Sequence, residues 1–179
     1  MTDSNRQRIW YFIQEWVFPV IIALIIVLLL NKFVFILVTV PTDSMEDTII
    51  AGDRLYVNEL FDLNDAKRGD ILVFKSDEDE LEDKRLVKRL IGLPGETVEI
   101  KRDGSIFIDG KKIDEPYALE SNGEEKVFTV PLNSYFFLGD NRPISYDARY
   151  WNEPYIGEDK VIGKVEFRFF PFNRIGEVE

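Results

Sequence analysis

The stretch V-F-P-V-I-I-A-L-I-I-V-L-L-L, residues 17–30, decides the architecture of this chain because it contains no charged residue. Extended back to Ile9, it reaches about the 20 residues that an α-helix needs to cross a bilayer. Trp10 and Trp16 lie toward its N-terminal end, where interfacial aromatic residues are common. We therefore predict one transmembrane helix that serves as a membrane anchor.

The charges that flank this span predict its orientation. Arg6 and Arg8 precede the apolar run, and basic residues favour the cytoplasmic side of a membrane. We expect a single-pass protein of the cell membrane with a cytoplasmic N-terminus. The predicted division is residues 1–33 for the N-terminus and anchor, and residues 34–179 for an extracytoplasmic domain.

Two other interpretations of the apolar run remain open. A cleavable signal peptide also has basic residues before an apolar stretch, but no small-x-small cleavage site follows this one. Instead, Asn31-Lys32 leads into a second apolar segment, Phe33 to Val40. A buried core helix is disfavoured because no polar face interrupts the central stretch.

After Pro41 the sequence changes to short segments rich in β-branched and aromatic residues, each bounded by Gly, Asp, Asn or Pro. This pattern predicts a mainly β domain. The Asp-Gly steps at 103–104 and 109–110 indicate hairpin turns. The predicted strands lie near residues 34–40, 54–58, 70–75, 85–91, 97–101, 106–109, 126–130, 134–138 and 160–170.

Composition excludes several classes of function. With 33 acidic and 22 basic residues the net charge is −11, which disfavours nucleic-acid binding. The chain has no His and no Cys, so a Ser-His-Asp triad, a thiolate nucleophile and a zinc finger cannot form. We expect neither a cofactor nor a bound metal. The acidic stretch at 76–83 is interpreted as a solvated loop, because it lacks the spacing of a calcium-binding loop.

Hydrolysis would therefore depend on hydroxyl groups, carboxylates and amines. Ser44 lies in P-T-D-S-M-E-D-T-I, residues 41–49, in a Pro-led turn where it is a candidate nucleophile or merely a turn residue. Lys88 lies in the predicted strand R-L-V-K-R-L-I-G among apolar neighbours. Burial there would lower its pKa and make it a candidate base, provided that the acidic residues of the turn point away. The alternative is a lysine that extends from a strand edge into solvent.

A third segment, F-L-G-D-N-R-P-I-S-Y-D-A-R at 137–149, gathers polar groups where an apolar strand meets a loop. Ser145, Asp147 and Arg149 could orient a catalytic amine. An Asp/Asn turn closed by an ion pair between Asp147 and Arg149 is the simpler interpretation.

Together, and in this order behind a membrane span, these segments resemble the bacterial type I signal peptidase family, which removes signal peptides from exported proteins. The resemblance covers the chain from the anchor to about Arg149. It is carried by P-T-D-S-M-E-D-T, G-D-R-L-Y-V, R-G-D-I-L-V-F, K-R-L-I-G-L-P-G-E and G-D-N-R-P-I-S-Y-D-A-R.

The resemblance implies a membrane-bound serine endopeptidase with a Ser44/Lys88 dyad and a mostly antiparallel β domain. It implies that the Ser44 N–H and the Thr42 hydroxyl hold the oxyanion. Ser145 would contact the lysine amine. Asp147, Arg149 and Asp140 would support the site.

The implied substrates are preprotein signal peptides, bound in extended form and cut after small-x-small sites. The implied surroundings are the lipid bilayer and the vicinity of the secretion translocon. No nucleic acid is expected.

The sequence departs from the family pattern at three positions. Thr42 stands where serine is common, which keeps a hydroxyl but adds a methyl group. Asp47 replaces the usual proline, which puts the rigidity and electrostatics of that turn in doubt. Ala148 replaces a frequent serine, with less consequence because no proton transfer is assigned there.

Two other functions are weighed against this one. A self-cleaving Ser/Lys protease of the stress-response repressor type is disfavoured by the membrane span and the G-D-N motif. A membrane-tethered binding module without turnover would retain the groove. The C-terminal F-R-F-F-P-F, residues 167–172, is expected to be a buried strand, with an apolar edge resting on the bilayer as the alternative.

Overall fold

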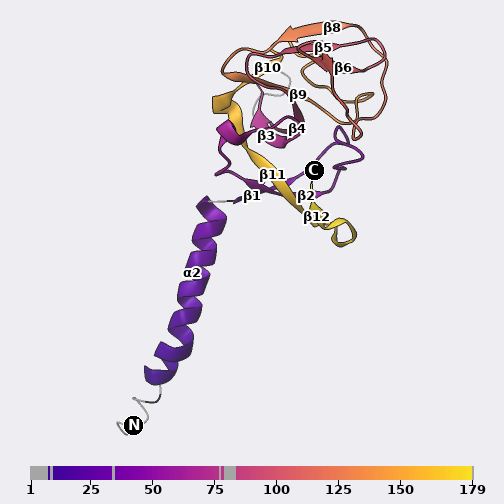
Figure 1. The fold of residues 1–179 in the computed structure, drawn as a ribbon. Helices are drawn as coiled ribbons and strands as arrows, with labels where there is room; N and C mark the ends of the chain where they lie inside the picture. Colours follow the sequence, from indigo (N-terminus) through magenta and orange to yellow (C-terminus); the bar gives the residue numbers. More distant parts are fainter. Residues whose placement is uncertain (1–7, 9, 34, 77, 79–83, 179) are drawn as a thin grey trace. The chain divides into compact units, whose positions relative to one another are not determined.

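The computed structural model describes residues 8, 10–33, 35–76, 78 and 84–178. The chain divides into two compact units, Met1–Ile36 and Leu37–Glu179. The first unit is mainly helical, and the second unit consists mainly of strands (Figure 1).

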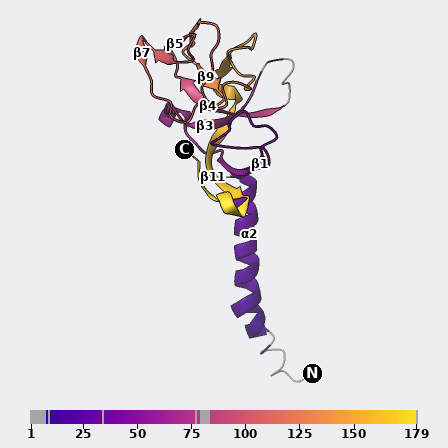
Figure 2. The same ribbon diagram turned by 90° about the vertical axis from the view of Figure 1, so that its right-hand side faces the viewer.

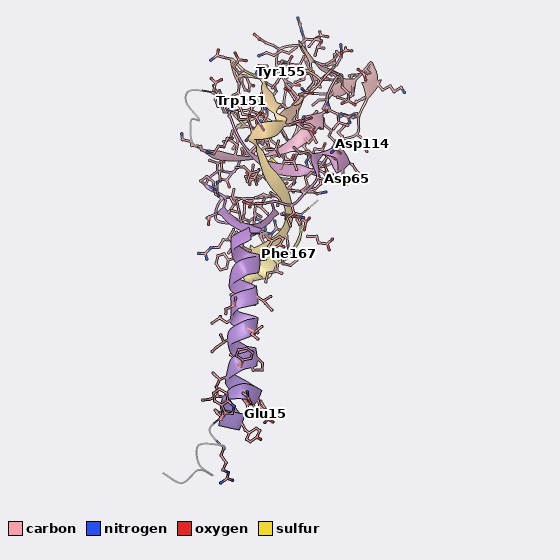
Figure 3. All side chains as sticks on the ribbon, turned by 90° about the vertical axis from the view of Figure 1, so that its left-hand side faces the viewer. Glu15, Asp65, Asp114, Trp151, Tyr155 and Phe167 are labelled. Carbon is pink, nitrogen blue, oxygen red and sulfur yellow. The ribbon has the colours of Figure 1, made fainter. Side chains whose placement is uncertain are left out.

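The helical unit contains the predicted apolar span. A π-helical turn, Ile13–Val17, leads into α2, Phe18–Phe33. Within the described residues, one helical stretch is long and apolar enough to cross a membrane: Trp10–Val27, 18 residues with a mean hydropathy of 1.9 and none of them buried. Figure 3 labels Glu15 toward the N-terminal end of this helix, away from its apolar centre. The predicted helix is confirmed.

The larger sheet of the second unit has eight described strands, which follow the order β1-β2-β11-β3-β4-β9-β10, with β12 beside β11. Every pairing with a described register is antiparallel. Its strands are β1 (Phe35–Thr39), β2 (Arg54–Asn58), β3 (Ile71–Lys75), β4 (Arg85–Gly92), β9 (Ser134–Leu138), β10 (Tyr155–Gly157), β11 (Val161–Phe170) and β12 (Gly176–Glu177).

The smaller sheet has four described strands in the order β7-β6-β5-β8, also antiparallel. Figure 2 shows β5 and β7 together at one end of the strand-rich unit. The strands are β5 (Thr97–Ile100), β6 (Ile106–Ile108), β7 (Lys111–Lys112) and β8 (Lys126–Thr129). Short 3₁₀ helices occur at Leu63–Asp65, Glu158–Lys160 and Phe172–Arg174.

One core joins the two sheets. Phe74 of β3 stacks on Phe137 of β9 with ring centroids 4.3 Å apart. Val98 of β5 and Ile106 of β6 belong to the same buried cluster. The core therefore fixes β3, β4 and β9 against the smaller sheet, and these strands carry or precede the candidate site residues.

The mainly β, antiparallel fold class is confirmed. Both Asp-Gly hairpin turns are confirmed as well, and Asp109 and Gly110 both adopt the positive φ of a tight hairpin turn, 48° and 76°. Three strands were not predicted: β7, β10 and β12. They have two or three residues each, which is too short for an alternating pattern, and they form because a neighbouring strand supplies the pairing.

The interpretation of the acidic stretch is wrong for two of its residues. Ser76 and Glu78 are buried, with 6% and 4% of their surfaces exposed. The Glu78 carboxylate accepts hydrogen bonds that stabilise its burial. The other residues of 76–83 lie outside the described part of the chain.

Candidate active site

Ser44 lies in the tight turn that joins β1 to β2. The turn is closed by the Ile49 N–H, which donates to the Met45 carbonyl over 2.7 Å. Met45 and Ile49 are buried and anchor the turn in the domain. Asp43 caps it from outside by accepting the Ala51 N–H over 2.7 Å. These contacts leave the Ser44 side chain partly exposed at the tip.

Lys88 lies on β4 with only 4% of its surface exposed. Its Nζ donates to Ser145 Oγ over 3.1 Å. Burial lowers the pKa of Lys88 to about 8, because water no longer stabilises the ammonium form. Asp147 and Asp140 raise that pKa, whereas Arg149 lowers it. Asp43 and Glu46, the acidic residues on either side of Ser44, are bonded elsewhere, to the Ala51 N–H and the Asn141 amide.

One cavity of about 390 Å³ brings Ser44 and Lys88 together. Its walls are mainly apolar and come from β1, the Ser44 turn and the first half of β4. The lining residues are Val38, Val40, Pro41, Thr42, Ser44, Met45, Lys84, Arg85, Leu86, Val87 and Lys88. Among the described contacts, none is a direct hydrogen bond between Ser44 and Lys88.

Two groups beside Ser44 can donate to a developing oxyanion. The Thr42 hydroxyl lies 3.4 Å from Ser44 Oγ. The Ser44 N–H has no hydrogen-bond partner among the residues that the structure describes, whereas the Ser44 carbonyl accepts the Asn141 N–H over 3.1 Å. A backbone N–H without a described partner and a hydroxyl therefore lie beside Ser44 Oγ.

The segment after β9 contacts Lys88 through Ser145. Asp147 is fully buried and pairs with Arg149 over 2.8 Å, as the simpler interpretation of this segment predicted. The Asp147 carboxylate also accepts the Gly139 N–H over 3.0 Å. Asp147 therefore links the end of β9 to the loop that presents Ser145.

Asp140 binds a different partner, Arg89. Its buried carboxylate receives two hydrogen bonds from Arg89, of 2.8 and 2.7 Å. The Thr48 hydroxyl donates to the same carboxylate over 2.7 Å. Because Arg89 directly follows Lys88 and Thr48 belongs to the Ser44 turn, this ion pair connects the two candidate reacting residues.

Two residues of the site were not identified from the sequence. Arg89 is one, although its alternation with Lys88 along the strand was a usable signal for a position on the opposite face. Gly139 is the other. A Cβ atom at Gly139 would lie 2.2 Å from Ser145 Oγ and 2.4 Å from the Ser44 carbonyl oxygen, and no sequence pattern reveals such a contact.

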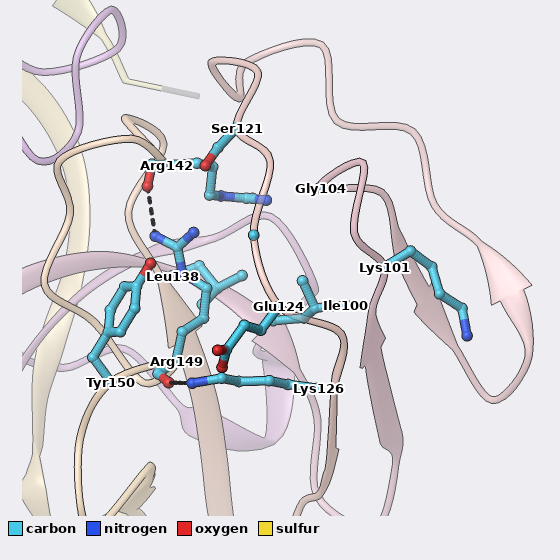
Figure 4. Close-up of a pocket in the computed structure, with 11 residues that line it drawn as sticks. Ile100, Lys101, Gly104, Ser121, Glu124, Lys126, Leu138, Arg142, Arg149 and Tyr150 are labelled. Carbon is cyan, nitrogen blue, oxygen red and sulfur yellow. Dashed lines mark hydrogen bonds between the residues drawn. The ribbon is translucent and has the colours of Figure 1, made fainter.

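A second cavity, of about 220 Å³, lies between the smaller sheet and the loop after β9 (Figure 4). Arg142 and Arg149 line it, but each guanidinium is held internally, by Glu115 and Asp147 respectively. Lys126 donates to the Arg149 carbonyl over 2.7 Å, as Figure 4 shows. Neither Ser44 nor Lys88 lines this cavity, so we assign the chemistry to the first one.

A serine hydroxyl and an amine with a lowered pKa in one apolar cavity are the elements of nucleophilic acyl transfer. Comparison with known proteins agrees with this chemistry. A profile of the family described as "Signal peptidase, peptidase S26" matches residues 13–170.

Individual relatives match over most of the chain. "Signal peptidase I" of Bacillus licheniformis is 38% identical over an alignment that covers 100% of both chains. "Signal peptidase I T" of Bacillus subtilis is 37% identical, covering 92% of this chain and 89% of the relative. A crystal structure of a signal peptidase I from Enterococcus faecalis is 35% identical, covers 55% of this chain and 95% of that one, and has a TM-score of 0.47.

Proposed function

The chain belongs to the signal peptidase family, peptidase S26, and on this premise we propose that it cleaves signal peptides from preproteins with Ser44 as nucleophile and Lys88 as general base. The observation that carries the proposal is the shared cavity, in which a buried lysine with a pKa of about 8 lies in the same apolar enclosure as the serine.

In the proposed reaction, neutral Lys88 accepts the proton of the Ser44 hydroxyl as Oγ attacks the scissile carbonyl carbon. The tetrahedral intermediate collapses when the lysine ammonium donates that proton to the leaving amine nitrogen. An acyl ester remains on Ser44. Lys88 then activates a water molecule, which releases the signal peptide as a free acid and restores the serine.

The Ser44 N–H and the Thr42 hydroxyl are the proposed oxyanion donors. Their support is the N–H without a described partner and the 3.4 Å between the two hydroxyl oxygens. Such donors act where charge develops in the transition state and contribute more than they would in bulk water.

Ser145, Asp147, Arg149 and Asp140 are the proposed supporting residues. Ser145 accepts the bond from Lys88 Nζ and orients the amine toward the cavity. The opposite effects of Asp147 and Arg149 on the Lys88 pKa partly cancel, so burial remains the dominant influence and favours the neutral base.

The preprotein is proposed to bind as an added strand beside β4. β9 pairs with β4 at Arg89, Leu90 and Gly92, so residues 85–88 have a described partner only on the β3 side. The cavity runs along this stretch. An open edge beside an apolar cavity suits an extended peptide, with backbone hydrogen bonds for affinity and small side chains that fit the cavity. Cleavage after small-x-small sites is part of the proposal.

We further propose that the helical stretch Trp10–Val27 anchors the enzyme in the cell membrane in a single pass. The N-terminus would be cytoplasmic and the strand-rich unit extracytoplasmic. Its partners would then be the lipid bilayer and preprotein signal peptides, in the vicinity of the secretion translocon.

The test is cleavage of a preprotein with an A-x-A site by detergent-solubilised wild type, Ser44→Ala and Lys88→Met. Cleavage after the site by the wild type, with loss in both variants, is the expected result. Normal cleavage by either variant would refute the dyad. Binding of the preprotein by a wild type that never cleaves it would favour a tethered binding module instead.

A further inference from the structure

Glu78 carries a buried carboxylate in the connection between β3 and β4. Only 4% of the residue is exposed. Its carboxylate accepts from the Tyr146 hydroxyl over 3.2 Å, from the Asn152 N–H over 2.9 Å and from the Asn152 side-chain amide over 3.1 Å. All three of these donors are neutral.

A carboxylate is costly to bury, and hydrogen bonds to the ionised form offset that cost. The Glu78 N–H in turn donates to Ser76 Oγ over 3.2 Å, and Ser76 is also buried. The β3 strand ends one residue before Ser76. The buried carboxylate therefore lies three residues beyond the end of β3.

The two residues that Glu78 holds delimit one functional segment. Tyr146 directly follows Ser145, and Asn152 closes the same stretch six residues later. Ser145, which accepts the hydrogen bond from Lys88 Nζ, directly precedes this segment. The Tyr146 ring also stacks on Tyr150, with centroids 6.4 Å apart, so the segment is held together along its length.

Trp151 adds a second attachment on the same side. Its buried ring packs edge-on against Phe74, with centroids 6.3 Å apart, and Phe74 lies on β3 two residues before Ser76. The segment that follows Ser145 is thus attached to β3 by one apolar contact, Trp151 on Phe74, and to the connection after β3 by the Glu78 carboxylate.

We propose that Glu78 is a positioning residue for catalysis: its carboxylate fixes both ends of the segment 146–152 and so keeps Ser145 Oγ in contact with Lys88 Nζ. The inference rests on the proposed function of Ser44 and Lys88. Glu78 does not line the reaction cavity, so its effect falls on the base and not on substrate binding.

The test compares full-length Glu78→Ala, Glu78→Gln and Tyr146→Phe with the wild type in detergent. Glu125→Ala is the matched control, because Glu125 is an exposed acidic residue that pairs with Lys101 on the smaller sheet. Preprotein cleavage gives kcat, KM and the pH profile. Amide hydrogen exchange of residues 145–152 reports directly on the segment.

For Glu78→Ala we expect kcat to fall about 10- to 100-fold at unchanged KM, because small misplacements of catalytic groups have effects of this size. Tyr146→Phe removes one of the three hydrogen bonds to Glu78, so its kcat should fall less than that of Glu78→Ala. Glu78→Gln keeps one acceptor oxygen, so its kcat should lie between those of the wild type and Glu78→Ala. The control should match the wild type.

The pH profile separates positioning from simple instability. Lys88 is influenced by Asp147, Arg149 and Asp140 from the β9 side, and Ser145 contacts it directly. A loosened segment admits water to the amine and raises the Lys88 pKa, so the limb on which the rate rises with pH should move to higher pH in Glu78→Ala. If the variant were only less stable, a smaller folded fraction would lower the maximal rate without changing the pH at which the rate rises.

Faster exchange across 145–152, together with a shifted limb, would support the proposal. If the amides of 145–152 exchange at the wild-type rate in Glu78→Ala, the proposal is overturned, whatever the activity of the variant. If the wild type shows slow amide exchange across 145–152 but never cleaves the preprotein, the proposed function is refuted. The amide exchange rate of Glu78→Ala would still decide whether the carboxylate holds the segment.

Discussion

Replacing Gly139 by Ala is the most direct test of the site geometry. The new Cβ would lie 2.2 Å from Ser145 Oγ and 2.4 Å from the Ser44 carbonyl oxygen. Because Cβ atoms do not come closer than about 3.0 Å to another heavy atom, Ser145 Oγ must retreat by about 0.8 Å and the Ser44 carbonyl by about 0.6 Å. The substitution thus pushes the nucleophile turn and the Lys88 contact away from β9.

A shift of this size predicts two separable effects. Misplacement of about 1 Å can reduce catalysis about 100-fold, so we expect kcat/KM for the A-x-A preprotein to fall by about that factor. Overpacking in a close-packed interior costs about 1–3 kcal/mol of unfolding free energy. The fold should therefore persist while most of the activity is lost.

The assay is preprotein cleavage over time, with thermal unfolding of the same preparation. Gly176→Ala is the matched control, because a Cβ there meets no atom within 4 Å. If folded Gly139→Ala cleaves within about twofold of the wild type, the close approach of β9 to the two serines has no catalytic role, and the geometric reasoning fails.

Four other predictions concern the remaining groups of the site. The wild-type rate should rise with pH to a midpoint near the Lys88 pKa of about 8, measured as kcat/KM across pH 6–10. Because the pKa of Lys88 in the folded state lies below the ordinary 10.5, burial of the ammonium destabilises the fold below pH 8. This cost decreases as pH rises from 8 to 10.5. In a denaturant titration, Lys88→Met should therefore unfold with a free energy up to about 3 kcal/mol higher than the wild type at pH 7, and with no such gain above pH 10.5. Thr42→Val should lower kcat about 100-fold while Thr42→Ser stays close to the wild type, because only the former removes the proposed oxyanion donor. Asp140→Ala should lower the unfolding free energy by about 3–5 kcal/mol in the same titration, since it leaves the Arg89 charge buried without its carboxylate.

The sequence predicted the parts of this structure that repeat or alternate. The apolar helix and nine strands follow from periodicity, and the two Asp-Gly turns follow from the positive φ that glycine tolerates. The absence of histidine leaves a lysine as the plausible base, whereas the pairing of Ser44 with Lys88 came from the resemblance to the family.

Contacts between distant segments could not be predicted in the same way. Glu78 lies in an acidic stretch whose composition indicates solvent exposure, yet Tyr146 and Asn152, about 70 residues later, supply the donors that allow its burial. The close approach at Gly139 likewise depends on where the Ser44 turn meets β9. A single sequence contains no local signal for either of these two long-range contacts.

Residues 85–88 of β4, which have a described strand partner only on the β3 side, could also pair with a second copy of the chain. Unpaired strand edges pair with any extended chain, including the edge of a second copy, and natural proteins restrain this with charged side chains. Arg85 is exposed at the start of this edge and faces Lys75 across the β3–β4 pair. Two edges of this kind brought together would oppose like charges, which disfavours pairing between copies at the stretch proposed for the substrate.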